Sequence, residues 1–259
     1  MIRWLINLMI TSMLFFPVKE FSSQPKDFKL TSEEVWCQTQ DGVKIHGWYL
    51  PAQEASLCLL FFHGNAENIA NRLPKAKEWV ARGISVFLID YRGYGKSEGE
   101  IKAGNDLTQD ASAALKWLQE VKNYTALQII LYGESIGAVP AIELGIKEKF
   151  KAIILEAPFT NLKELAKHHY GMAPDFMLKD FALDNEIKIS QLKSPLFIMH
   201  GTQDEVVPFQ MGRYLFEKAP EPKKFFEIKN AHHNDISLVG GNAFFDEPFR
   251  FATSQKNTT

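Results

Sequence analysis

The sequence predicts an α/β fold in which a mostly parallel sheet carries helices on both faces. Buried apolar runs alternate along the chain with segments of helical spacing, which is typical of strand–helix–strand units. One turn between a strand and a helix is rich in glycine: Gly-Glu-Ser-Ile-Gly at 133–137 follows the apolar run 129–132 and precedes a helical pattern that reaches Lys147. With 259 residues, 46% of them hydrophobic and 23% charged, the chain has the composition of one globular domain.

The charge composition excludes one broad class of partner. The formal net charge is -2, the isoelectric point is near 6.4, and no block of basic residues interrupts the chain. These values give no electrostatic reason for binding to phosphate backbones. We therefore expect no nucleic acid as a partner.

Residues that bind metals or form disulfide bonds are few and poorly spaced for either role. Cys37 and Cys58 lie on segments that have the pattern of separate strands, which predicts buried free thiols. The histidine pairs at 168–169 and 232–233 are adjacent in sequence, so their side chains point to different faces of a strand or helix. We therefore expect no metal and no cofactor.

The N-terminal segment, residues 1–23, differs from the rest of the chain. Arg3 is the only charged residue before Lys19, and it stands among large apolar side chains. The stretch is short for a bilayer span and has the size of a signal-peptide core. No small-x-small cleavage motif surrounds Glu20 and Phe21, which favours an uncleaved signal anchor; a cleaved signal peptide and a cytosolic amphipathic helix are the alternatives. Arg3 on the cytoplasmic side would leave the domain membrane-anchored or secreted, in the periplasm or a lumen.

Periodicity and turn residues divide residues 31–252 into the elements of one domain. Asp41-Gly42 predicts a hairpin turn between a strand around 35–37 and a strand over 43–50. Buried strands are predicted over 57–62, 84–89, 128–132, 152–155, 196–199 and 225–228, and helices over 72–82, 106–121, 136–147 and 211–218. Regular periodicity is lost in an insert over 158–194, and residues 253–259 form a polar tail.

The pattern Gly-x-Ser-x-Gly between a strand and a helix gives its serine a chemical role. The backbone at Ser135 is expected to be strained, because the chain must reverse there within one or two residues. Gly133 and Gly137 lack a Cβ, so the strand and the helix can approach closely while the hydroxyl stands at the strand's carboxyl end. The helix N-terminus then offers N–H groups to an oxyanion.

Reactive side chains follow four of the predicted strands. They are Asn65, Ser135, Asp204 and the pair His232-His233. Because the carboxyl ends of parallel strands meet at one edge of a sheet, we expect these side chains to gather in one crevice. The order Ser, Asp, His along the chain is that of the α/β-hydrolase fold.

Five motifs carry a specific resemblance to the α/β-hydrolase superfamily. They are His-Gly-Asn at 63–65, Asp-Tyr-Arg-Gly-Tyr-Gly-Lys-Ser-Glu-Gly at 90–99, Gly-Glu-Ser-Ile-Gly at 133–137, His-Gly-Thr-Gln-Asp-Glu-Val-Val-Pro at 200–208 and His-Asn-Asp at 233–235. From about Glu34 to the C-terminus, the chain most resembles small serine hydrolases with prolyl-oligopeptidase-like catalytic domains, a group that includes membrane-anchored lysophospholipid and acylglycerol lipases and protein depalmitoylases. The resemblance implies the α/β-hydrolase fold with a short lid insert.

The resemblance assigns a catalytic triad to Ser135, Asp204 and His233. The serine attacks, the histidine takes its proton and returns it to the leaving group, and the aspartate orients the imidazole. The family usually has a glycine-rich turn before His-Asn-Asp, which this chain lacks. Alignment on Asn-Asp favours His233 as the base, with His232 as the alternative.

Two backbone N–H groups are expected to bind the oxyanion, those of Ile136 and Asn65. The side chain of Asn65 is an alternative donor. His63 and Arg92 belong to the same motifs, and we expect them to hold loops in place rather than to catalyse. Asp235 is expected to cap a helix.

The insert over 158–194 stands where the family carries its lid. It contains Met172, Phe176, Met177 and Phe181, which either pack onto the domain or line a groove for an acyl chain. A lid this short should leave the site open, which suits a lipid or an acylated surface.

The sequence therefore predicts a serine hydrolase that cleaves carboxylic esters through an acyl-enzyme, with a small-molecule acyl ester or lipid as substrate. An acyl-thioesterase or protein depalmitoylase is a close alternative, because the same groups attack thioesters. A serine peptidase is another alternative, and so is a non-catalytic binding protein on the same fold. Membrane association through the N-terminal segment is expected.

Overall fold

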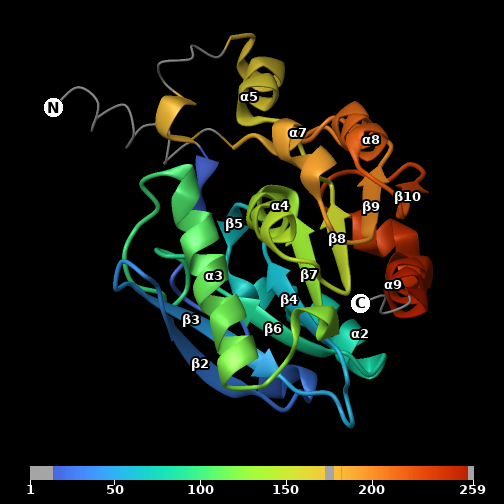
Figure 1. The fold of residues 1–259 in the computed structure, drawn as a ribbon. Coiled ribbons are helices and arrows are strands. Elements are labelled where there is room, and N and C mark those ends of the chain that lie inside the picture. The colour runs from blue at the N-terminus through green and yellow to red at the C-terminus, as the bar shows by residue number, and fades with distance from the viewer. Residues whose placement is uncertain (1–13, 173–177, 182, 256–259) are drawn as a thin grey trace, which may run out of the picture.

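A mixed sheet of eight strands forms the centre of the structure (Figure 1). The computed structural model describes residues 14–172, 178–181 and 183–255. The strands of the sheet are β2 (Glu33–Gln38), β3 (Lys44–Leu50), β4 (Cys58–Phe62), β6 (Ser85–Ile89), β7 (Ile129–Glu134), β8 (Ala152–Glu156), β9 (Leu196–Gly201) and β10 (Lys223–Ile228).

The strand order is β10-β9-β8-β7-β4-β6-β3-β2. β3 runs antiparallel to both of its neighbours, β2 and β6, while the pairs from β6 to β10 are all parallel. The carboxyl ends of β4, β7, β8, β9 and β10 therefore meet at one edge of the sheet. The predicted mostly parallel sheet is confirmed.

Helices cover both faces of this sheet (Figure 1). One face is covered by α3 (Gly104–Glu120), α4 (Ala138–Lys147) and α8 (Phe209–Lys218), and the other by α2 (Leu73–Ala81) and α9 (Ile236–Ser254). The helices α5 (Leu162–Tyr170) and α7 (Asn185–Lys188) belong to the insert over 158–194. The short 3-10 segments are η1 (Pro25–Phe28), η2 (Ile69–Arg72), η3 (Ala126–Gln128), η4 (Ser135–Gly137), η5 (Lys179–Phe181) and η6 (Ile189–Gln191).

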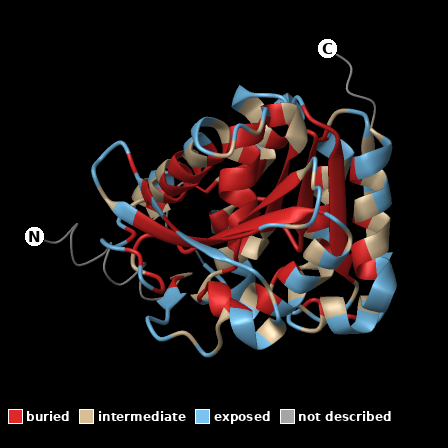
Figure 2. Ribbon diagram, turned by 90° about the horizontal axis from the view of Figure 1, so that it is seen from below, coloured by how far each residue is buried: buried red, intermediate tan, exposed pale blue. Residues whose placement is uncertain are grey.

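The side chains of the central strands alternate between two core layers. In β4, Cys58, Leu60 and Phe62 belong to the layer that α3 and α4 cover. Leu59 and Phe61 belong to the layer that α2 and α9 cover. Because both faces are packed, the strand is apolar throughout, and Figure 2 shows such buried strands between the helices.

Both cysteines are buried and free, as the sequence predicts. Burial in apolar surroundings raises the pKa of the Cys37 thiol to about 12 and also raises that of Cys58. Neither thiol is therefore ionised at neutral pH.

Residues 14–23, expected from the sequence to lie outside the domain, pack against it. The Phe15 side chain is buried, and strand β1 (Phe16–Pro17) pairs in parallel with β5 (Ala66–Glu67). The ring of Phe21 lies 4.7 Å from that of Trp48. The folded domain thus includes residues well before position 31, which corrects the predicted boundary. Residues 1–13 lie outside the described residues, and within the described part no helix has the length and apolar character needed to cross a bilayer.

Helix α9 was not predicted, because its sequence contains several residues that disfavour helices. Gly240-Gly241 and Pro248 lie inside it, and Gly241 adopts φ +54° and ψ −139°, which kinks the helix. Its apolar side chains, among them Phe244 and Phe245, nevertheless pack into the core. Burial outweighs the local propensity, and the helix continues two residues past the predicted domain end at 252.

Candidate active site

The turn after β7 holds Ser135 in the left-handed conformation, with φ +53°. This conformation costs about 1–3 kcal/mol for a residue other than glycine, so the surrounding structure must impose it. A Cβ on Gly133 would lie 2.5 Å from the Gly137 carbonyl oxygen, and a Cβ on Gly137 would lie 2.1 Å from the Phe62 carbonyl oxygen. Both positions therefore admit only glycine, and the turn lies directly against the end of β4.

Asp204 lies in the loop after β9, and hydrogen bonds surround its carboxylate. Oδ1 accepts from the backbone N–H groups of Val206 at 2.9 Å and Val207 at 2.7 Å. Oδ2 lies 2.8 Å from Nδ1 of His233 and 3.2 Å from Nε2 of His200. Burial raises the pKa of Asp204, but the two histidines and the Val207 N–H outweigh burial and hold this pKa well below its usual range. Asp204 is thus an anion at neutral pH.

His233 lies in the turn between β10 and α9, with its side chain 13% exposed. Because Asp204 is ionised, Nδ1 of His233 carries the proton that it donates, and Nε2 is left unprotonated, as an acceptor. Burial lowers the pKa of His233, but the hydrogen bond to Asp204 and the charges of Asp204, Glu134 and Glu156 raise it above its ordinary value. The charged form of the His233 imidazole is therefore stabilised.

The neighbouring histidine has a different partner. Nδ1 of His232 lies 2.8 Å from the carboxylate of Glu205, and both side chains are half exposed. The backbone N–H of His232 donates to Asp235, the residue that precedes α9, so Asp235 holds the turn. Of the two histidines, the structure brings His233 to Asp204.

The two segments expected to supply the oxyanion donors are adjacent. Ile136 is in η4, next to Ser135, and Asn65 follows β4. A Cβ on Gly137 would lie 3.0 Å from the His63 carbonyl oxygen, so the backbone before Asn65 lies against the nucleophile turn.

Three contacts that fix the Asn65 loop were not predicted. The hydroxyl of Tyr94 donates to the carbonyl of Asn65 at 2.7 Å, and that of Tyr91 donates to the carbonyl of His63 at 3.0 Å. The backbone N–H of Phe16 donates to the same Asn65 carbonyl at 2.9 Å. The motif at 90–99 marks the tyrosines, but no local pattern identifies their partners or gives Phe16 this role.

Comparisons with known proteins identify the family of this chain. The sequence family described as "Serine aminopeptidase, S33" matches residues 53–179. Protein bem46 of Schizosaccharomyces pombe is 34% identical over 229 residues, which cover 84% of this chain and 76% of that protein. Alpha/beta hydrolase domain-containing protein 17B of Homo sapiens is 33% identical over 229 residues, which cover 85% and 75%. The chain belongs to the α/β-hydrolase superfamily.

Solved structures of two esterases have the same fold. An esterase from Pyrococcus furiosus superposes with a TM-score of 0.79 at 20% identity, covering 93% of this chain and 97% of that one. An esterase from Exiguobacterium antarcticum gives a TM-score of 0.67 at 17% identity, covering 86% and 100%. At such identities the likeness shows the fold alone, and it confirms the predicted α/β-hydrolase fold.

His63 and Arg92 of this hydrolase make the structural contacts expected of loop-holding residues. Arg92 donates to the buried Asp110 at 2.9 Å and to Asp41 at 2.8 Å. Nδ1 of His63 lies 2.7 Å from the Gly64 carbonyl oxygen, and burial lowers the pKa of His63 to about 4. A neutral, fully buried imidazole of this kind supports the loop rather than exchanging protons with a substrate.

The predicted substrate residues of the hydrolase's insert differ in their surroundings. Phe181 is fully buried, and its ring lies 6.1 Å from that of Phe15. This burial agrees with the alternative that Phe181 packs onto the domain. Met172 is exposed just beyond α5, while Phe176 and Met177 lie outside the described residues. Nε2 of His169 in α5 lies 2.7 Å from the Val206 carbonyl oxygen, so the end of α5 adjoins the Asp204 loop.

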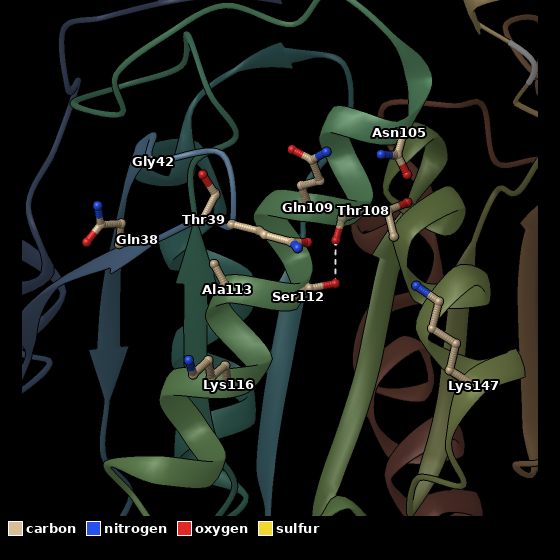
Figure 3. Close-up of a pocket in the computed structure, with 11 residues that line it drawn as sticks. Gln38, Thr39, Gly42, Asn105, Thr108, Gln109, Ser112, Ala113, Lys116 and Lys147 are labelled. Carbon is tan, nitrogen blue, oxygen red and sulfur yellow. Dashed lines mark hydrogen bonds between the residues drawn. The ribbon is translucent and has the colours of Figure 1, made fainter.

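A large polar cavity is lined by residues other than those of the predicted site (Figure 3). Its volume is about 750 Å³, and it lies between the β2–β3 hairpin, α3 and the end of α4. Thr39, Gln109, Lys116 and Lys147 are among the residues that line it, and no predicted site residue is. A smaller cavity of about 330 Å³ lies between α5 and η5, with Phe181 in its wall.

Proposed function

We propose that this hydrolase cleaves acyl esters of lipids through an acyl-enzyme formed on Ser135. The observation that carries the proposal is the 2.8 Å contact between Nδ1 of His233 and Asp204, at the same sheet edge as the strained serine turn. An ionised aspartate that fixes the tautomer of a histidine prepares the other ring nitrogen to take a proton from a serine hydroxyl.

The reaction follows from the arrangement in two halves. Nε2 of His233 takes the hydroxyl proton as the oxygen of Ser135 attacks the acyl carbon, and the N–H groups of Asn65 and Ile136 stabilise the resulting oxyanion. The imidazolium then gives its proton to the leaving alcohol as the carbon–oxygen bond breaks. In the second half, His233 deprotonates water, which attacks the acyl-enzyme and releases the acid with the serine restored.

Exposed apolar side chains beside the site support a lipid as the substrate. Phe16, Tyr170 and Met172 are all more than half exposed. Phe16 is hydrogen-bonded to the Asn65 loop, and Tyr170 adjoins His169 at the Asp204 loop. Large apolar groups in water are unfavourable, and their position at the site entrance fits contact with acyl chains.

The place of β1 supports retention of the N-terminal segment and thus an uncleaved membrane anchor. Signal cleavage near residues 20–23 would remove β1 and Phe15, which pack against the domain. The apolar sequence that precedes Leu14 would then hold the site close to a membrane. An extracytoplasmic domain follows from the position of Arg3 and is part of the same proposal.

The test uses the full-length protein in detergent, with Ser135→Ala as the blank. A fluorophosphonate should label the wild-type protein and leave the variant unlabelled. Initial rates on esters from acetyl to palmitoyl should rise with chain length and vanish in the variant. Rates on matched thioesters and on aminoacyl amides are measured in the same assay. A thioester rate above the ester rate would favour the thioesterase alternative, and an amide rate above it would favour the peptidase alternative. Absence of both labelling and Ser135-dependent turnover would contradict the proposal and favour a binding protein.

A further inference from the structure

A network of buried charges lies beneath the nucleophile turn. Oε1 of Glu134 accepts from Nη2 of Arg72 at 2.7 Å, and Oε2 accepts from Nζ of Lys75 at 2.8 Å. Nζ of Lys75 also donates to Glu156 at 2.8 Å, and the hydroxyl of Tyr132 donates to Glu156 at 2.5 Å. The four charged side chains are between 3% and 18% exposed. Two cations and two carboxylates thus meet behind the turn, away from bulk water.

Arg72 joins the two segments that carry the oxyanion donors. Glu134 directly precedes Ser135, and Nη1 of Arg72 binds the carboxylate of Glu67 at 2.8 Å. Glu67 stands two residues after Asn65, in the short strand β5, and its side chain is half exposed. One planar guanidinium therefore holds the nucleophile turn on one side and the Asn65 loop on the other.

The ion pair also lies close to the loop at Gly64, where it leaves little room for a side chain. A Cβ on Gly64 would lie 3.0 Å from Oε1 of Glu134 and 3.4 Å from Nη2 of Arg72. Gly64 contributes the carbonyl half of the peptide whose N–H belongs to Asn65. The ion pair therefore packs beside this donor peptide.

Stability alone is a weak reason to keep such a network. Removing charges from water costs several kcal/mol for each ion, and a buried ion pair is often no more stabilising than apolar side chains of similar volume. Burial lowers the pKa of Arg72 and of Lys75, but the facing carboxylates outweigh burial and raise both. Burial likewise raises the pKa of Glu134, and the two cations lower it below its usual range. All three groups are therefore charged, and their hydrogen bonds are directional and strong.

We propose that the ion pair between Arg72 and Glu134 is a positioning device that sets the separation of the two oxyanion donors. The inference rests on the proposed function of the site. The position of a backbone N–H group is set by the course of the main chain. An oxyanion hole loses its effect when such a donor is displaced from the position of the oxyanion. Arg72 and Glu134 touch no reacting atom, so they act through the backbone as positioning residues.

The test compares Arg72→Lys and Glu134→Gln with a matched control. Arg72→Lys keeps the positive charge but loses the fork that binds two carboxylates at once. Glu134→Gln keeps the shape of the side chain and weakens the pair. Arg82→Lys is the control, because Arg82 also bridges two carboxylates, those of Glu78 and Asp246, at 2.8 Å each and with a similarly buried side chain.

The measurement uses the full-length protein and a short acyl ester, with active sites counted by fluorophosphonate titration. Arg72→Lys should lower kcat per titrated site by on the order of 10- to 100-fold with little change in KM. The affinity for an alkyl boronic acid, which forms a tetrahedral adduct with serine, should fall by a similar factor. Glu134→Gln should show a smaller loss of the same kind, and Arg82→Lys should retain wild-type kcat and boronate affinity.

Three results would overturn the positioning role. The first is a kcat per titrated site in Arg72→Lys equal to that of the wild type. The second is an Arg72→Lys variant in which only the fraction of titratable sites or the melting temperature falls. The third is a lowered kcat in Arg72→Lys together with an unchanged affinity for the boronic acid. If Arg72→Lys does not fold, Glu134→Gln carries the same comparison. A wild-type protein without Ser135-dependent hydrolysis would instead reject the proposed function, and the positioning role with it.

Discussion

Two adjacent acidic residues meet two adjacent histidines at the site, and their pairing decides which histidine can act as a base. Asp204 meets His233 in a largely buried contact, while Glu205 meets His232 in water. A half-exposed ion pair contributes little, because solvent screens it. The buried contact orients an imidazole and stabilises its charged form, which is what a general base requires.

Substitution of each histidine separates these roles. His233→Ala removes the base and should lower kcat by on the order of 10⁴-fold. His232→Ala breaks only the exposed pair and should lower kcat by less than about tenfold. Rates per folded protein, with folding checked by circular dichroism, test both. A larger loss in His232→Ala than in His233→Ala would reverse the assignment.

The pKa of His233 predicts the acid limb of the pH profile. The base must be neutral to accept the serine proton, so kcat/KM falls as the pH drops through this pKa. Because Asp204, Glu134 and Glu156 outweigh burial and raise the pKa, the limb should have its midpoint above about 6.5, the ordinary value for histidine. A midpoint below that value in a kcat/KM profile would contradict the predicted direction.

Gly137 tests the close contact between the nucleophile turn and β4. Gly137→Ala would place a Cβ 2.1 Å from the Phe62 carbonyl oxygen, and both groups belong to rigid backbone. In urea denaturation, the free energy of unfolding of this variant should be lower than that of the wild type by about 3 kcal/mol or more, and kcat per folded protein should also be reduced. Gly83→Ala is the control, because its Cβ would meet nothing within 4 Å and only the positive φ would cost about 1 kcal/mol. Equal losses in the two variants would show that the contact is relaxed.

At the scale of elements, the N-terminal strand connects the segment before it to the site. β1 pairs with β5 next to Asn65, and the side-chain amide of Asn68 donates to the carbonyls of Val18 and Glu20. The backbone N–H of Gly95 also donates to the Val18 carbonyl. The segment therefore braces both the Asn65 loop and the loop of the 90–99 motif.

Two truncations test this brace. Removal of residues 1–13 leaves β1 and should preserve most of kcat on a soluble short ester. Removal of residues 1–21 deletes Phe15, β1 and the Phe21 ring, and it should lower the melting temperature by at least several degrees, since each buried aromatic side chain contributes about 2 kcal/mol. Thermal scans and ester assays of the two forms give the comparison. Equal behaviour would mean that β1 does not support the site.

At the scale of the whole molecule, the start of the described chain lies beside the Asn65 loop of the proposed site. The exposed Phe16, Tyr170 and Met172 are near the Asn65 and Asp204 loops, and the apolar N-terminal sequence runs into β1. A membrane bound through residues 1–13 would thus face the site. This arrangement would bring acyl chains to Ser135 at high local concentration.

Membrane binding can be measured without any assay of turnover. The full-length protein should sediment with phosphatidylcholine vesicles, and the form without residues 1–13 should stay largely in the supernatant. The net charge of -2 makes attraction to anionic lipid a weak contribution, so vesicles with added phosphatidylserine should bind no better. Equal sedimentation of the two forms would assign membrane binding to the domain surface instead.

The fold and much of the proposed site follow from local sequence patterns. Apolar runs of strand length, the glycines around Ser135 and the motif that holds Asp204 act over a few residues, so their periodicity and turn chemistry are readable one segment at a time. Local patterns also explain what the sequence does not predict. Gly240-Gly241 and Pro248 disfavour a helix where α9 forms, and the apolar N-terminal segment has the pattern of a segment outside the domain, although β1 pairs with β5.

Tertiary structure alone decided the pairings between distant segments. Which hydroxyl holds Asn65 and which cation meets Glu134 depend on how loops from different strands converge; Arg72 and Glu134, for example, lie 62 positions apart. The sequence by itself determined the fold and the residues that could act, because burial and turn geometry are encoded in neighbours. It did not determine which residues hold Asn65 and Glu134, since a hydrogen bond or an ion pair depends on distances that exist only after the sheet has brought its carboxyl ends together.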